Sequence, residues 1–241
     1  MGEFEFRSRY AKDTKLEMSR EEEKYYRLLR MYARFLAPFY DAVTLFISNL
    51  RDKVVDFTEA PARSLILDVA TGTGKQAFAF AKKGFEVVGI DLSEHMLNVA
   101  VKKNTYANVR FQIADATKLP FEDNCFDVSC VSFALHDMIL TIREKALREM
   151  RRVTKTNGTM IIVDYGLPKN KIGKFFVFNF VGLYEPYYTE FIKSDLLGLL
   201  ENTGIEIKRD VPVIFGAARI IKGSPRAASG VKNKREEKIA Q

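Results

Sequence analysis

A glycine-rich loop that follows an apolar run contains the residue types best suited to holding a ligand. Leu65 to Val69 is apolar apart from Asp68, and Ala70-Thr71-Gly72-Thr73-Gly74 comes directly after it. Glycine lets the backbone approach a ligand closely, and a helix beginning near Lys75 would offer free N–H groups to an anion. The pattern predicts a site for the anionic part of a nucleotide-like cofactor at the end of a strand.

The loop by itself fits several classes of nucleotide-binding protein. Gly72-Thr73-Gly74-Lys75-Gln76-Ala77 has the spacing of a dinucleotide loop. A phosphate-binding loop of the NTPase kind is excluded, because it needs Gly at position 69 and Ser or Thr at position 76, where the chain has Val69 and Gln76. The residues that follow must therefore discriminate between a dinucleotide and another adenosine-containing cofactor.

Two acidic residues follow the loop at the ends of later strands. Asp91 ends the apolar run Glu86 to Ile90, where a carboxylate can accept hydrogen bonds from both ribose hydroxyls. Asp115 ends the next strand and could accept a hydrogen bond from an adenine amino group. His136 follows the fourth strand and is the best-placed candidate for a general base, although a wall residue without a proton role is an open alternative.

The elements that position these residues alternate between strand and helix, which predicts a parallel sheet with helices on both faces. A helix begins at Ser19, with acids in its first turn, and a second one ends near residue 57. The expected strands are residues 65–69, 86–90, 108–113, 126–133, 159–163, 205–211 and 213–221, the last two pairing antiparallel about Pro212. The expected later helices are residues 75–83, 93–104, 142–153, 171–184 and 195–202.

The whole succession resembles class I S-adenosylmethionine (SAM) dependent methyltransferases, and within them the ubiquinone/menaquinone biosynthesis methyltransferase family and its relatives. The resemblance is carried by residues 66–74, 88–93, 115–116, 119–121, 126–128, 132–136 and 146–153. It implies a doubly wound, Rossmann-like α/β fold with a seven-stranded sheet, mostly parallel with an antiparallel C-terminal hairpin, under an N-terminal helical cap.

The resemblance also implies roles for particular residues, with SAM as the cofactor and no metal. Asp68 would organise the loop and hold the amino group of the methionine moiety, and Asp91 would bind the ribose. Phe133 and His136 would face the cleft of cofactor and substrate. The cofactor-binding residues implied in this way are Tyr40, Asp68, Ala70, Thr71, Gly72, Gly74, Asp91, Leu92, Met96, Asp115, Ala116 and Phe133.

The expected activity is methyl transfer to a small-molecule acceptor, apolar or lipid-like, of the quinone-precursor or phospholipid type. Aromatic-rich segments near both ends of the chain, including Tyr25, Tyr26 and Tyr187, could line an apolar acceptor pocket. The alternatives are an RNA or protein methyltransferase, a non-catalytic SAM-binding protein and an NAD-dependent oxidoreductase. The absence of an Asn/Asp-Pro-Pro-aromatic motif after the fourth strand argues against a nucleic-acid acceptor.

Composition limits the remaining choices. The net charge of +7 favours an acidic partner, such as an anionic membrane surface contacted peripherally. Cys125 and Cys130 are expected to be free thiols in a reducing cytoplasm, and the oligomeric state is left open. We expect a mobile arm over residues 1–20, the helical cap over 21–60, the methyltransferase domain over 61–222 and a disordered basic tail over 223–241.

Overall fold

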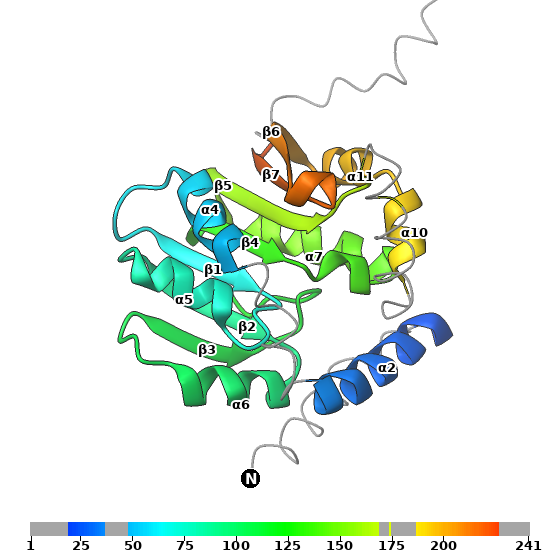
Figure 1. Cartoon of the computed structure of the whole chain (residues 1–241), viewed down its shortest axis with the longest axis horizontal. Coiled ribbons are helices and arrows are strands. Elements are labelled where there is room, and N and C mark those ends of the chain that lie inside the picture. Colours follow the sequence, from blue (N-terminus) through cyan, green and yellow to red (C-terminus); the bar gives the residue numbers. More distant parts are fainter. Residues whose placement is uncertain (1–18, 37–47, 169–173, 175–186, 227–241) are drawn as a thin grey trace, which may run out of the picture.

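A single seven-stranded sheet organises the molecule, with strand order β3-β2-β1-β4-β5-β7-β6 (Figure 1). The computed structural model describes residues 19–36, 48–168, 174 and 187–226. The first five strands pair parallel to one another, while β7 is antiparallel to both β5 and β6. The predicted sheet with its antiparallel C-terminal hairpin is confirmed.

The strands are β1 (Leu65–Val69), β2 (Glu86–Asp91), β3 (Val109–Ile113), β4 (Phe126–Ser132), β5 (Thr154–Tyr165), β6 (Ile205–Val213) and β7 (Ala218–Pro225). The α-helices within the described residues are α2 (Arg20–Leu36), α4 (Ser48–Thr58), α5 (Lys75–Lys82), α6 (Glu94–Lys103), α7 (Leu140–Val153), α10 (Tyr188–Lys193) and α11 (Leu196–Asn202). Two short 3-10 helices, η2 (Leu135–Asp137) and η4 (Ile214–Gly216), connect strands to the elements that follow them.

Helices cover both faces of the sheet, which is why the strands are apolar on both sides. Ile66 and Val128 point to the face covered by α4 and α5, whereas Leu67 and Ile162 point to the face covered by α7 and α11 (Figure 1). Val54 of α4 is fully buried in the first of these layers. Helix α4, the second helix of the expected cap, therefore packs on a face of the sheet, apart from α2.

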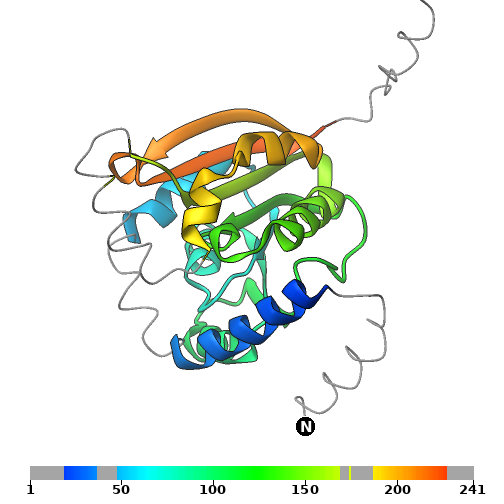
Figure 2. The same ribbon diagram turned by 90° about the vertical axis from the view of Figure 1, so that its right-hand side faces the viewer.

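Helix α2 lies on the side of the molecule to which the carboxyl ends of the parallel strands point. In Figure 2 this side faces the viewer, with α2 and α10 both on it. The helix begins with a reciprocal capping box, because Glu22 N donates to Ser19 Oγ at 3.1 Å and Ser19 N donates to Glu22 Oε2 at 3.2 Å. Lys145 of α7 pairs with Glu22 at 2.7 Å and fixes the start of α2 over the sheet edge.

The C-terminal hairpin turns later than the sequence predicts. Pro212 lies inside β6, opposite Arg219, and the turn is formed by η4 instead. Because β6 is an edge strand, a residue without an N–H is tolerated there. Strand β7 also runs to Pro225, beyond the expected boundary at residue 222, since Pro225 still pairs with Ile205 at the start of β6.

Strand β5 begins earlier than expected. Asn157-Gly158, which the sequence predicts to be a turn, lies within β5, next to a shift in register between β5 and β4. A Cβ on Gly158 would lie 2.8 Å from the carbonyl oxygen of Asp127, so the glycine allows a close approach of two strands. Helix α10 was not predicted, and the helix expected over residues 171–184 lies almost entirely outside the described residues.

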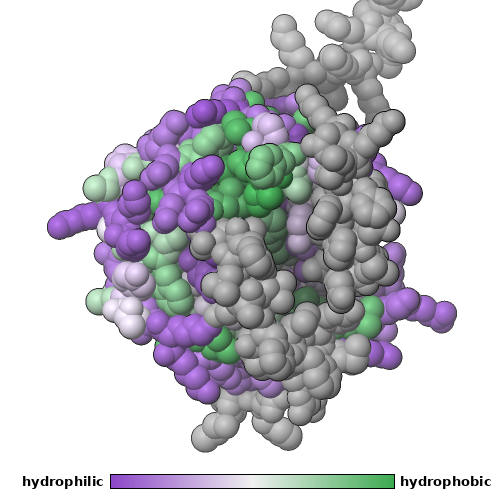
Figure 3. Space-filling model, viewed as in Figure 1, coloured by the Kyte–Doolittle hydropathy of each residue, from purple (hydrophilic) through white to green (hydrophobic). Residues whose placement is uncertain are grey.

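The surface is charged in many places but also exposes apolar side chains at the C-terminal hairpin. In the view of Figure 3, which is that of Figure 1, an apolar area lies near the top, in the region of the C-terminal hairpin. At the hairpin turn Phe215 is 97% exposed and Ile214 is 42% exposed. Both residues have positive φ angles, which places them in a strained conformation for residues with side chains.

Candidate cofactor and substrate site

Two hollows meet at the carboxyl ends of β1, β2 and β4. Ala70, Gly72 and Phe133 line both of them, so the glycine loop forms the wall between the two. Strand β1 has β2 on one side and β4 on the other, because the chain runs from β1 through β2 to β3 and then crosses to β4 on the opposite side of β1. This change of direction is the switch point at which open α/β sheets bind their ligands.

Strained backbone marks the junction of the two hollows. Ala70 has φ of 54° and Phe133 has φ of 52°, although both carry a Cβ. Such conformations cost on the order of 1–3 kcal/mol each and cluster at functional sites. The loop is held in this form by Thr71 N, which donates to Ile90 O at 2.8 Å, and by Gly72 N, which donates to Asp91 Oδ2 at 2.8 Å.

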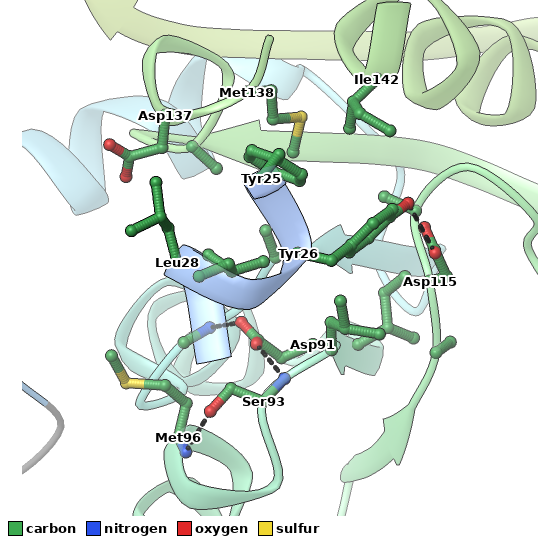
Figure 4. A pocket seen from close by; sticks show the side chains of 18 of the residues that line it. Tyr25, Tyr26, Leu28, Asp91, Ser93, Met96, Asp115, Asp137, Met138 and Ile142 are labelled. Carbon is green, nitrogen blue, oxygen red and sulfur yellow. Dashed lines mark hydrogen bonds between the residues drawn. The ribbon is translucent and has the colours of Figure 1, made fainter. Parts of the chain in front are cut away.

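Asp91 organises the larger hollow from the end of β2. Besides Gly72 N, its carboxylate accepts a hydrogen bond from Ser93 N at 2.8 Å (Figure 4). Burial raises the pKa of the Asp91 carboxyl, against the lowering effect of these backbone hydrogen bonds. The arrangement holds a carboxylate in a fixed orientation on the pocket wall, where it can accept hydrogen bonds from a diol.

The smaller hollow has the donor and acceptor pattern of an amino-acid site. Asp68, 1% exposed, lines it and accepts a hydrogen bond from Thr71 Oγ1 at 2.5 Å. Burial raises the pKa of the Asp68 carboxyl to about 7. The side chains of Arg51 and Lys75 line the same hollow, and burial together with the charge of Arg51 lowers the pKa of Lys75.

Gln76 completes this hollow with an unsatisfied acceptor. Its Oε1 atom is buried without a hydrogen-bond partner among the described residues, while its Nε2 atom donates to Arg51 O at 3.4 Å. A buried amide oxygen without a donor is costly unless a ligand supplies one. Acceptors at Asp68 and Gln76 suit an ammonium group, and the cations at Arg51 and Lys75 suit a carboxylate. The residues present therefore fit the methionine end of SAM.

The larger hollow is roofed by α2. Tyr25, Tyr26, Leu28 and Leu29 line it from this helix. Tyr26 donates its hydroxyl to Asp115 Oδ2 at 2.9 Å, while Asp115 Oδ1 accepts from the backbone N–H and the hydroxyl of Thr117, each at 2.8 Å. The tyrosine therefore contacts the same carboxylate that the sequence predicts as the acceptor for an adenine amino group.

Most of the residues predicted from the sequence come together here. Those that line one hollow or both are Asp68, Ala70, Thr71, Gly72, Asp91, Leu92, Met96, Asp115, Ala116 and Phe133. Gly74 lines neither; it is the N-cap of α5 with φ of 82°, and a Cβ there would lie within 3 Å of the Phe111 and Phe78 rings. Tyr40 lies outside the described residues.

The structure places His136 behind the pocket wall, which differs from the prediction that it faces the cleft. The side chain is 3% exposed and is not among the residues that line the pocket. Its Nδ1 atom lies 2.7 Å from Asp164 Oδ1, and its ring packs against Tyr165 at 4.6 Å between centroids. Its neighbour Asp137 lines the pocket instead.

Sequence reasoning missed Arg51, Gln76 and Asp164. Arg51 comes from a helix far from the loop in the chain, and no local pattern connects the two. Gln76 and Asp164 had a usable signal, because Gln76 comes two residues after the loop and Asp164 follows the apolar run near the end of β5. Tyr25 and Tyr26 had been predicted as part of an aromatic lining, without a specific partner.

Comparison with known proteins identifies methyltransferases among the proteins similar to this chain. Residues 67–162 match the family model described as a methyltransferase domain. The chain is 35% identical over 166 residues to a demethylmenaquinone methyltransferase of Paenarthrobacter aurescens, covering 67% of this chain and 60% of that protein. It is 38% identical over 114 residues to a ubiquinone/menaquinone biosynthesis C-methyltransferase of Azotobacter vinelandii, covering 44% of each chain.

Among solved structures, a SAM-dependent methyltransferase from Aquifex aeolicus is similar, with a TM-score of 0.59 and 25% identity over 73% of this chain and 89% of that one. The resemblance and the Rossmann-like fold expected from the sequence are thereby confirmed. The chain spans about 60% of the length of the first curated relative that it matches. Within the described residues, no helix is long and apolar enough to cross a membrane.

Proposed function

We propose that the chain is a SAM-dependent methyltransferase that methylates a small quinol-type ring, because residues 67–162 match a methyltransferase domain. The observation that carries this proposal is the pair of hollows that meet at the glycine loop. One hollow has two cationic residues, a buried carboxyl and an amide oxygen without a hydrogen-bond donor among the described residues. These groups suit the methionine moiety of SAM. The other has Asp91 and Asp115 on an apolar wall, which suits adenosine.

The residues of the site divide between holding the cofactor and enclosing the reaction. Asp68 and Gln76 would hold the ammonium group, Arg51 and Lys75 the carboxylate, and Asp91 the ribose. The cofactor supplies a methyl group on a positively charged sulfur, which is already an activated electrophile. The protein's own contribution is then to fix the two reactants and to exclude water.

The acceptor side of the larger hollow is aromatic and apolar. Tyr25, Leu28, Met138, Ile142 and Tyr187 line it, from α2, from the turn after β4, from α7 and from the residue before α10. Such a lining suits a flat apolar ring better than a sugar or a charged peptide. The names of the relatives, which are quinone-biosynthesis methyltransferases, support the same choice.

We also propose that the protein is cytoplasmic and contacts an anionic membrane peripherally. The exposed Phe215 at the hairpin turn and the net charge of +7 support this contact, because apolar side chains and basic charge together favour binding to anionic lipid. The hairpin turn joins β6 to β7. Because the start of β7 pairs with the carboxyl end of β5, the turn lies at the same edge of the sheet as the site.

The test is a binding titration followed by transfer of a labelled methyl group. Calorimetry should detect SAM binding, with NAD as the comparison ligand, and binding of NAD alone would overturn the proposal. Label from SAM should enter chemically reduced 1,4-naphthoquinone, whereas total RNA should remain unlabelled. Label in RNA with none in the naphthoquinol would refute the acceptor class. Protein that stays in the supernatant when anionic vesicles are sedimented would refute the membrane contact.

A further inference from the structure

Among the described residues, three acidic side chains line the larger hollow: Asp91, Asp115 and Asp137. The first two suit the ribose and the adenine of the cofactor. Asp137 is the third, and Figure 4 shows it on the opposite side of the pocket from Asp115. Asp137 stands on a wall otherwise made by Tyr25, Leu28 and Met138, apart from the two carboxylates assigned to adenosine, so it is available to act on the acceptor.

The turn that carries Asp137 is held in place by two buried charged residues. From β5, Asp164 is fully buried and accepts hydrogen bonds from Leu135 N at 2.9 Å and His136 N at 3.2 Å. From α7, the fully buried Arg143 donates to Leu135 O at 3.0 Å and to Met138 O at 2.7 Å. Both ends of the turn are thus anchored, which fixes the backbone of Asp137 before any ligand arrives.

The same arrangement connects Asp137 to a buried imidazole. Asp164 Oδ1 lies 2.7 Å from His136 Nδ1, and His136 Nε2 lies 3.6 Å from Asp137 Oδ2. If Nδ1 donates its proton to Asp164, Nε2 carries a lone pair that faces a carboxylate oxygen. At 3.6 Å the two atoms are too far apart for a hydrogen bond, but the imidazole and the carboxylate are close enough to interact electrostatically.

We propose that Asp137 is the group that receives the acidic proton of the acceptor, and that His136 and Asp164 are positioning residues behind it. This inference rests on the proposed methyl transfer. An acceptor that gains a methyl group must release one proton. The O–H bond of the acceptor hydroxyl breaks, its electron pair stays on the oxygen, and the proton passes to Asp137. The ring then forms a carbon–carbon bond to the methyl group as the carbon–sulfur bond breaks and its electron pair leaves on the sulfur. Transfer of the ring hydrogen, as a proton, to the oxygen restores the quinol. His136, whose Nε2 lies 3.6 Å from Asp137 Oδ2, is a positioning residue that keeps the carboxylate on the pocket wall.

The neighbours of Asp137 allow this role. The charged and titratable groups around it are Tyr25 on α2 and His136 on its own turn, with Asp164 of β5 and Arg143 of α7 behind the turn. Tyr187 lines the same pocket from the residue before α10. The Asp137 side chain is 41% exposed, so it can reach both the pocket and solvent, to which the proton must finally go.

The experiment compares Asp137→Asn with the control variant Asp56→Asn. Asp56 is an exposed aspartate on α4 that pairs with Lys83. Asp137→Asn should lower methyl transfer to reduced 1,4-naphthoquinone by about 100-fold and leave SAM affinity within about twofold. Asp56→Asn should change neither. If SAM affinity is lost in Asp137→Asn, the residue holds the cofactor and the inference is wrong. Failure of wild-type protein to bind SAM would instead count against the proposed function.

A second measurement does not depend on turnover. The chain has two histidines, His95 and His136, so the titration of each ring can be followed by NMR. Replacing Asp137 by Asn removes an anion next to His136 Nε2 and should lower the pKa of His136 by about one unit, with His95 unchanged. An unchanged His136 titration, or full methyl transfer by Asp137→Asn, would overturn the proposal.

Discussion

The two ends of the parallel strands use aspartate in opposite ways. At the amino end, Asp127 near the start of β4 accepts hydrogen bonds from Leu65 N at 2.8 Å and from Lys155 Nζ at 2.6 Å. Burial opposes ionisation there, but these bonds hold the pKa of Asp127 below its usual range. At the carboxyl end, Asp68 and Asp91 accept from a hydroxyl and from backbone N–H groups, and burial raises the pKa of both.

This difference separates a structural role from a ligand-binding one. A carboxylate that pairs with a lysine at the molecular surface joins neighbouring strands and gains little from a ligand. A buried carboxylate that is held by neutral donors stays ready for hydroxyl or ammonium groups, at a cost to the folded protein without cofactor. At the carboxyl end of the sheet, these carboxylates therefore favour ligand binding and lower the stability of the cofactor-free protein.

The largest expected effect follows from replacing one aspartate at each end. Asp91→Asn should weaken SAM binding by about 10- to 100-fold, because hydrogen bonds to a charged group contribute about 1.5–3 kcal/mol. Asp127→Asn should leave SAM affinity unchanged and lower the free energy of unfolding by about 1 kcal/mol. Calorimetric titration measures the SAM affinity, and urea unfolding measures the free energy of unfolding. Equal SAM affinities for wild type and Asp91→Asn would show that the aspartates at the two ends do not differ in ligand binding.

A smaller effect concerns pH. The pKa of Asp68 is about 7 in the folded protein, above its value in an unfolded chain. Its protonated form is therefore favoured by folding, so its stabilisation is complete below about pH 4 and is lost as pH rises through 7. Between pH 4.5 and 7.5 the free energy of unfolding of the cofactor-free protein should fall, with Asp68 accounting for an amount on the order of 2 kcal/mol.

Urea unfolding at several pH values checks this expectation. Asp68→Asn should flatten the decline by that amount. Asp127→Asn is the matched control, because the lowered pKa of Asp127 leaves it ionised in both states above pH 4.5, so the slope should not change. Parallel pH curves for wild type and Asp68→Asn would show that Asp68 does not titrate in this range.

The smallest effect is expected at the roof of the pocket. Tyr26 already donates to Asp115, the carboxylate expected to receive a hydrogen bond from adenine. Tyr26→Phe should therefore strengthen SAM binding by about two- to tenfold, the value of one net hydrogen bond. Tyr106→Phe, which alters a ring stacked on Phe78 away from the pocket, is the control. Weaker binding in Tyr26→Phe would mean that Tyr26 supports the cofactor.

Local patterns predicted the sheet well and failed where backbone geometry depended on a neighbour. The apolar runs of β1, β2 and β4 were recognisable because both faces of these strands are buried. Pro212 and Gly158 were assigned to turns, yet each lies within a strand. Pro212 is tolerated because β6 is an edge strand, and Gly158 is needed because the Asp127 carbonyl comes close to it. Neither condition can be recognised in the sequence.

The sequence by itself determined the strand ends and the acids that follow them, because a strand, its loop and its helix are continuous in the chain. Asp68, Asp91 and Asp115 could be assigned to one edge of the sheet on this basis. Only the tertiary structure decided which side chains from distant segments join them. It brought Arg51 to the glycine loop, Tyr26 to Asp115 and Asp164 to His136, and it put Asp137 rather than His136 on the pocket wall.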